Sequence, residues 1–139
     1  MTSEISAEAG AQAIARSKKI ALSLEARGRG GTIVLHCQGR LIFRHEANEL
    51  ARTVTDILPV ARRMVVDLAG IEAIDSSGLG ELVLLHMWAD SSGYTLKFSG
   101  ARKSLRKALE LSNLVQVLNL YSSVPEAIAA MQEDEACSA

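Results

Sequence analysis

Segments with the two-residue period of a strand alternate along this chain with segments that have the 3.6-residue period of a helix. The first two strands are expected at residues 20–27 and 32–38, where apolar and polar side chains alternate. Between them lie Gly28, Gly30 and Gly31, and a glycine-rich break of this kind predicts a turn. The chain is therefore expected to open with an antiparallel hairpin.

The later elements follow the order expected of an α/β protein. An apolar stripe at residues 47–58 predicts a helix that stops at Pro59, and the compact apolar run Met64–Leu68 predicts a strand covered on both faces. After these come a helix to about Asp90, a strand at Thr95–Ser99, a short helix at 105–109, a short strand at Val117–Leu120 and a final helix at Val124–Met131. This order predicts an α/β fold with a mixed, mostly parallel sheet of four to five strands, an N-terminal β-hairpin and about four helices.

One domain accounts for all of these elements. The chain has 139 residues, 48% of them hydrophobic, which suffices for one core. We expect this domain to span residues 19–132. Residues 1–18 have poor apolar spacing and are expected to form an N-terminal arm outside the core, and residues 133–139 form an acidic C-terminal end.

Composition excludes several classes of protein. A net charge of −1 argues against nucleic acid as the main partner. No apolar run approaches the roughly 20 residues of a membrane span, and the first residues lack the pattern of a signal peptide. Cys37 is expected to be a small apolar strand residue and Cys137 a free surface thiol, because their spacing fits no metal site. We therefore expect a cytoplasmic protein that needs no metal and no cofactor.

The segment Asp75–Gly80 joins a predicted strand to a predicted helix and is the strongest candidate for a functional site. A serine at such a junction caps the helix, and the unpaired N–H groups behind it favour negative charge. A phosphate on Ser76 would be accommodated there, with Asp75 beside it to orient the hydroxyl or accept its hydrogen bond. The segment is thus open to two interpretations, a plain helix cap and a phosphate acceptor.

Enzymatic use of these serines is disfavoured by the surrounding residues. A hydrolase nucleophile elbow needs the pattern G-x-S-x-G, and neither Ser76 nor Ser77 has a glycine two residues earlier. A phosphate-binding loop of the form G-x-x-x-x-G-K-[ST] is absent from the sequence. We therefore expect a protein that is not an enzyme.

The helix after this segment is apolar most of the way round. Its core stripe is expected to be Leu79, Leu82, Val83 and Met87, which leaves other apolar side chains on its other faces: Leu84, Leu85 and Trp88. These are either covered by neighbouring elements or exposed for a partner or self-association. His86 is expected to be packed, and the basic cluster at 102–107 to be a solvated face.

The segment Val65–Gly80 resembles the signature of the STAS domain, in the style of the bacterial anti-sigma factor antagonists. Gly39–Leu41 and Gly100–Lys103 also fit the pattern of that family. The resemblance covers residues from about Lys19 to Gln132, which is nearly all of the expected domain.

What the resemblance implies is a non-enzymatic switch. Members of the family bind an anti-sigma factor that is also a serine kinase, and this binding releases a sigma factor. The kinase phosphorylates the serine after the motif aspartate, which corresponds to Ser76, and a metal-dependent phosphatase of the PP2C type reverses the reaction. The remaining motif positions map onto the partner-binding loop: Asp75, Ser77, Gly78, Leu79 and Gly80. A scaffold subunit of a sensory or membrane transport assembly is the alternative, and a homodimer stays open.

Overall fold

The structure is a computed structural model that describes residues 22–118 and 120–138, the last four of these by backbone alone. The N-terminal arm expected at residues 1–18 and the side chain of Cys137 lie outside the described part. No described helix is long and apolar enough to cross a membrane.

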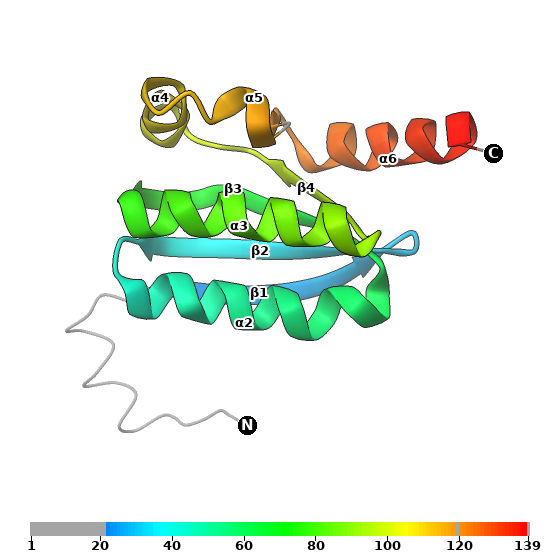
Figure 1. Ribbon diagram of the computed structural model, residues 1–139, viewed down its shortest axis with the longest axis horizontal. Helices are drawn as coiled ribbons and strands as arrows, with labels where there is room; N and C mark the ends of the chain where they lie inside the picture. The colour runs from blue at the N-terminus through cyan, green and yellow to red at the C-terminus, as the bar shows by residue number, and fades with distance from the viewer. Residues whose placement is uncertain (1–21, 119, 139) are drawn as a thin grey trace.

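One five-stranded sheet forms the centre of the molecule (Figure 1). Its strands lie in sequence order: β1 (Leu22–Arg29), β2 (Thr32–Leu41), β3 (Arg63–Ile74), β4 (Thr95–Ser99) and β5 (Leu120–Tyr121). The β1–β2 pair is the antiparallel hairpin, and every later pair is parallel. The expected mixed, mostly parallel sheet is confirmed.

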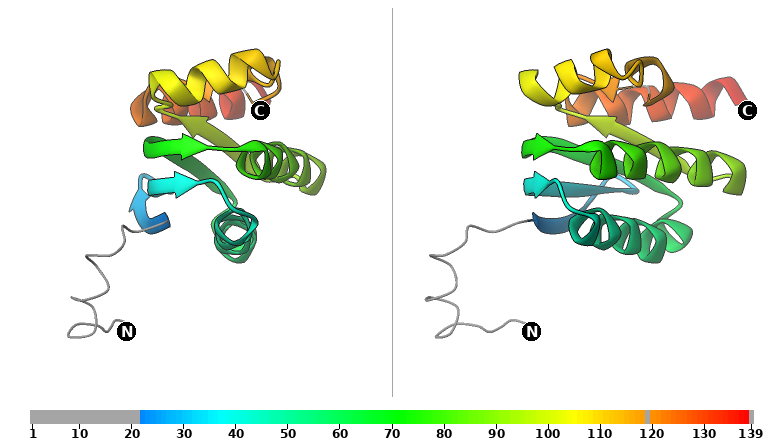
Figure 2. Two further views of the ribbon diagram at one scale, coloured as in Figure 1. Left: turned by 90° about the vertical axis from the view of Figure 1, so that its left-hand side faces the viewer. Right: turned by 60° about the vertical axis from the view of Figure 1, so that its left-hand side comes forward.

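Five helices flank the sheet in the described part of the chain: α2 (Arg44–Ala61), α3 (Ser76–Ser92), α4 (Lys103–Leu111), α5 (Val115–Leu118) and α6 (Val124–Ser138). Helices α2 and α3 run side by side over one face of the sheet (Figures 1 and 2). Helix α6 covers the opposite face, because Val65, which alternates in β3 with the core residues Met64 and Val66, packs against Ala127 and Met131 of α6.

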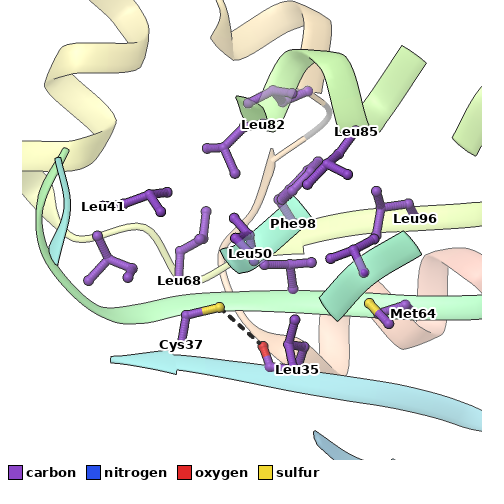
Figure 3. Close-up of a cluster of buried hydrophobic side chains, with 14 of the residues drawn as sticks. Leu35, Cys37, Leu41, Leu50, Met64, Leu68, Leu82, Leu85, Leu96 and Phe98 are labelled. Atoms are coloured by element: carbon purple, nitrogen blue, oxygen red, sulfur yellow. Dashed lines mark hydrogen bonds between the residues drawn. The ribbon is translucent and has the colours of Figure 1, made fainter. Parts of the chain in front are cut away.

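The main core lies between the sheet and helices α2 and α3, and aliphatic side chains dominate it (Figure 3). Cys37 belongs to this core, and its Sγ donates a hydrogen bond to the Leu35 carbonyl at 3.7 Å. Burial raises the pKa of the Cys37 thiol to about 12, with a smaller effect from Asp67. The expectation of a small apolar strand residue is therefore confirmed, and a thiol with so high a pKa is unreactive.

The prediction that Pro59 stops the first helix was wrong, because α2 continues to Ala61. A proline this near the end of a helix removes a single N–H donor and leaves the following turn intact. The helix ends instead at Arg62, which has φ 72° and donates its N–H to the Leu58 carbonyl at 2.7 Å.

The prediction of a strand over Val117–Leu120 was also largely wrong. Val115–Leu118 forms the helical turn α5, and the strand β5 begins only at Leu120. A four-residue apolar run has no period that separates a strand from a helical turn. Contact with α3 and α4 decides the outcome here, and it buries Leu118 completely.

The final helix is confirmed, and its capping pattern is present. The Ser123 hydroxyl accepts the backbone N–H of Glu126 at 3.3 Å, and Ala127 and Met131 are buried as expected. Helix α6 continues to Ser138, so the acidic residues after Gln132 form its last turns.

Candidate functional site

The junction between β3 and α3 is built around Asp75. This residue has an extended backbone, and its carboxylate Oδ1 accepts the N–H groups of Ser77 at 3.0 Å and Gly78 at 3.1 Å. The expectation that a serine caps the helix was wrong, because Ser76 is already the first helical residue. The cap position needs the non-helical backbone that only Asp75 has here.

Asp75→Ala is expected to lower the free energy of unfolding by about 1 kcal/mol, the typical contribution of a helix cap. Asp75→Asn retains an acceptor oxygen and is the control, with an expected loss of a few tenths of a kcal/mol. Urea denaturation monitored by circular dichroism measures both variants. Equal stability of Asp75→Ala and the wild type would contradict the capping role.

The first turn of α3 packs closely against the end of β2. The Asp75 N–H donates to the Leu41 carbonyl at 3.3 Å. A Cβ atom added at Gly78 would overlap that same carbonyl oxygen and would lie 2.7 Å from Ile74 Cγ1. Gly80 differs, because a Cβ atom there would meet nothing within 4 Å. Gly78 therefore allows α3 to pack closely against the end of β2. Gly80 lies on the outer surface of the helix, where a side chain would meet no other part of the protein.

The two serines of the motif differ in exposure. Ser76 is exposed as the first residue of α3, while Ser77 is half-buried. The side chain of Leu79 is half-buried against the main core. Of the six motif residues, only Ser76 and Gly80 are exposed.

The helix that begins at Ser76 carries acidic but no basic side chains. Helix α3 contains Glu81 and Asp90 and no lysine or arginine. Partial burial raises the pKa of the Glu81 carboxyl. A phosphate on Ser76 would meet the carboxylate of Asp75 next to it, which already accepts the N–H groups of Ser77 and Gly78. The favourable contribution from α3 is then its helix dipole.

The buried side of α3 differs from the predicted stripe. Leu82 is buried as expected, but Leu85 and Ala89 are buried as well, and Met87 is exposed. The placement of Met87 in the core and of Leu85 outside it was wrong. A helix that is apolar all round carries no periodic signal for its buried side, so contacts with α2, α5 and β4 fix its rotation.

Trp88 packs within the molecule. Its ring lies 5.4 Å from the Tyr94 ring, and the Arg62 guanidinium lies 5.5 Å from the same Tyr94 ring. Trp88 is half-buried and contacts the main core, and His86 is half-buried too. Among the apolar side chains of α3, those most open to a partner are therefore Leu84 and Met87.

Trp88→Ala is expected to lower the free energy of unfolding by about 2 kcal/mol, less than for a fully buried tryptophan. The reason is the lost contact with Tyr94 and the core. Thermal and urea denaturation test this, with Trp88→Phe as the control that keeps an aromatic ring. A stable Trp88→Ala protein with weakened partner binding would assign Trp88 to an interface instead.

Sequence patterns did not single out Phe43, which lies beside the site. It precedes α2, is 57% exposed, and belongs to the connection whose Leu41 carbonyl contacts the Asp75 N–H. Buried Glu46 holds this connection by accepting the Ile42 N–H at 3.1 Å. Phe43 is four residues before Ala47, in line with the apolar stripe, but as the cap residue it precedes the helix and is exposed, so helical periodicity does not predict its place.

No metal site appears in the described part of the chain, where no three histidine, cysteine, aspartate or glutamate side chains gather suitably. The basic cluster at 102–107 belongs to the start of α4, where Arg102 donates to the Ala69 carbonyl at 2.8 Å. The other basic side chains of this cluster are exposed: Lys103, Arg106 and Lys107. The exposed hydroxyl of Ser76 is therefore the group in this site that is best placed for modification.

Solved structures with similar folds come from regulators and from a transporter family. An anti-sigma factor antagonist of Mycobacterium paratuberculosis aligns with a TM-score of 0.70 and 20% identity over 80% of this chain and 94% of that one. Unphosphorylated SpoIIAA of Bacillus, an anti-sigma factor antagonist also solved in phosphorylated form, aligns with a TM-score of 0.65 and 17% identity over 80% and 97%. A sulfate transporter family protein of Wolinella succinogenes gives a TM-score of 0.63 and 18% identity over 75% and 87%. At these identities the likeness concerns the fold.

Comparison of sequences identifies the family of this chain as well as its fold. A STAS-domain containing protein of Pseudomonas aeruginosa strain UCBPP-PA14 is 33% identical over 92 residues, which cover 66% of this chain and 89% of that protein. The family model of the STAS domain matches residues 23–127, from β1 to the first turn of α6. With the β3–α3 junction at the centre of this matched region, the chain belongs to the STAS domain family.

Proposed function

We propose that this chain is an anti-sigma factor antagonist whose binding to its partner is switched off by phosphorylation of Ser76. The observation that carries the proposal is the exposed Ser76 hydroxyl at the first residue of α3, beside a cap that Asp75 already supplies. SpoIIAA, which shares the fold, has been solved with and without phosphate.

The proposed partners are an anti-sigma factor serine kinase, which uses ATP, and a PP2C-type phosphatase, both in the cytoplasm. Binding of the unphosphorylated chain would free the sigma factor from the kinase. The proposed recognition loop has two kinds of residue. Ser76 and Gly80 face the partner, whereas the other members give the loop its shape: Asp75, Ser77, Gly78 and Leu79. We propose that the domain with this function spans residues 19–132.

A phosphate on Ser76 would oppose binding for an electrostatic reason. It adds about −1.5 to −2 charges at neutral pH. Asp75 is adjacent and α3 contains no basic side chain, so the chain itself offers no cationic partner from this helix. In an interface the charge would lose water without a compensating cation from α3.

A scaffold role in a transport or sensory assembly is the second candidate. The similar fold of the sulfate transporter family protein favours it. In that role Ser76 stays unmodified, and binding to the assembly does not depend on ATP.

The decisive experiment incubates the chain with ATP and the purified anti-sigma factor kinase of the same organism and records its mass. The wild type is expected to gain one phosphate, Ser76→Ala none, and Ser77→Ala one. Phosphate on Ser77 of the wild type would overturn the site assignment. Binding of the kinase without any modification would favour the scaffold role.

A further inference from the structure

Helix α6 packs through a small apolar cluster of its own. Its buried side chains Ala127 and Met131 pack with Val65 of β3, and this cluster is separate from the main core. Each of the other four helices contributes at least one buried leucine to the main core, to which no described side chain of α6 belongs. Loss of the α6 contacts would therefore leave the main core intact.

The connection of α6 to the sheet is also short and lies near the end of the chain (Figure 1). The helix follows β5, a strand of only two residues, through Ser122 and Ser123. Movement of α6 thus changes the backbone at one connection only and displaces no later strand or helix. An element with few buried apolar contacts at the end of a domain is typical of a segment that opens locally.

An ion pair joins the last turns of α6 to the sheet. The Lys97 Nζ of β4 lies 3.1 Å from the Asp134 Oδ2 of α6. The Lys97 side chain is only 10% exposed, whereas that of Asp134 is 66% exposed. Lys97 also donates to the Tyr121 hydroxyl at 3.4 Å and lies 5.3 Å from the centre of the Tyr121 ring. The carboxylate on α6 thus supplies opposite charge to a buried ammonium group.

Burial of polar groups on this face of the sheet opposes the closed position of α6. Removing an ammonium group from water costs free energy that only an opposite charge and hydrogen bonds offset. Ser99, on the same side of β4 as Lys97, is fully buried, and its Oγ has no hydrogen-bond partner in the described part of the chain. The packing of α6 is therefore a balance between a small apolar cluster, one ion pair and these costs.

We propose that α6 is a detachable helix, which opens as a unit about Ser122 and Ser123 while the rest of the domain stays folded, and that the ion pair between Lys97 and Asp134 holds it closed. Opening exposes the Lys97 ammonium group on the face of the sheet that α6 covers. Ser76 belongs to α3, which packs on the other face, so the candidate site keeps its structure in both positions of α6. This inference does not depend on the proposed function.

Hydrogen exchange of the full chain, followed by mass spectrometry at low urea concentrations, tests the opening. After correction for intrinsic rates, the amides of α6 are expected to exchange at least about 100-fold faster than those of β3. Their exchange is also expected to depend less on urea, because opening of one helix exposes less surface than global unfolding. Equal rates and equal urea dependence in α6 and β3 would overturn the proposal. Fast exchange confined to the last turn of α6 would be ordinary fraying and would overturn it too.

Asp134→Asn tests the ion pair, with Glu133→Gln as the matched control. Both variants remove one carboxylate from the same turn, and Glu133 is exposed. Asp134→Asn is expected to speed exchange throughout α6 about tenfold, the lower end of what loss of a hydrogen bond to a charged group produces, and to leave β3 unchanged. Glu133→Gln is expected to leave α6 exchange within about twofold of the wild type. Equal effects of the two variants would overturn the role of the ion pair.

A double-mutant cycle separates the ion pair from a general effect of charge on the helix. Lys97→Met keeps the length of the side chain and removes its charge. If Asp134 acts through Lys97, Asp134→Asn changes α6 exchange by less than twofold in the Lys97→Met background. A tenfold effect of Asp134→Asn in that background would show that Asp134 acts without Lys97 and would contradict the proposal.

Discussion

The Ser76→Asp variant is expected to bind the anti-sigma factor at least about 100-fold more weakly than the wild type, a loss of about 2.7 kcal/mol. Its fixed charge would lie beside Asp75, on the face that we propose the partner covers, and burying an unpaired charge costs several kcal/mol. Folding is expected to be normal, because a carboxylate in the first turn of α3 interacts favourably with the helix dipole. Titration calorimetry measures the binding, and urea denaturation confirms the fold.

Two further substitutions separate charge from shape at this position. Ser76→Asn has nearly the size of Ser76→Asp without its charge and is expected to bind within about tenfold of the wild type. Ser76→Ala is expected to bind like the wild type and to resist phosphorylation, which makes it a constitutively active antagonist. If the fully phosphorylated protein, with phosphate on Ser76, binds the anti-sigma factor tightly, the proposed switch is wrong.

Gly78→Ala is expected to lower the free energy of unfolding by about 3 kcal/mol, at the upper end of the overpacking range. The added methyl group would overlap the Leu41 carbonyl oxygen and would lie 2.9 Å from Leu41 Cγ. That oxygen is backbone and also accepts the Asp75 N–H, so it cannot move aside without loss of this hydrogen bond. Equilibrium urea unfolding of the full chain measures the change.

Gly80→Ala is the matched control, because it makes the same substitution two residues later in the same helix. A methyl group there would meet nothing within 4 Å. Alanine favours a helix over glycine by up to about 1 kcal/mol, so this variant is expected to be equally or more stable. Equal stability losses in the two variants would contradict the assignment of Gly78 to packing and of Gly80 to the surface.

The order of strands and helices could be predicted from periodicity, because a strand and a helix repeat at different intervals along the chain. The opening hairpin follows from the glycines at 28–31, and the buried strand from the run Met64–Leu68. The alternation in its strand predicts Cys37 as an apolar residue on the same side as Leu35, and both are buried in the core. The motif Asp75–Gly80 marked both the family and the junction that carries the candidate site.

Tertiary contacts decide which side of each helix is buried where the sequence pattern does not predict it. Helix α3 is apolar all round, so contact with its neighbours, and not its own sequence, buries Leu85 and exposes Met87. Gly78 and Gly80 look alike in the sequence, yet only Gly78 meets the Leu41 carbonyl from a strand 37 residues earlier. Periodicity reports which residues share a side of one element, whereas the direction that this side faces depends on elements distant in the chain.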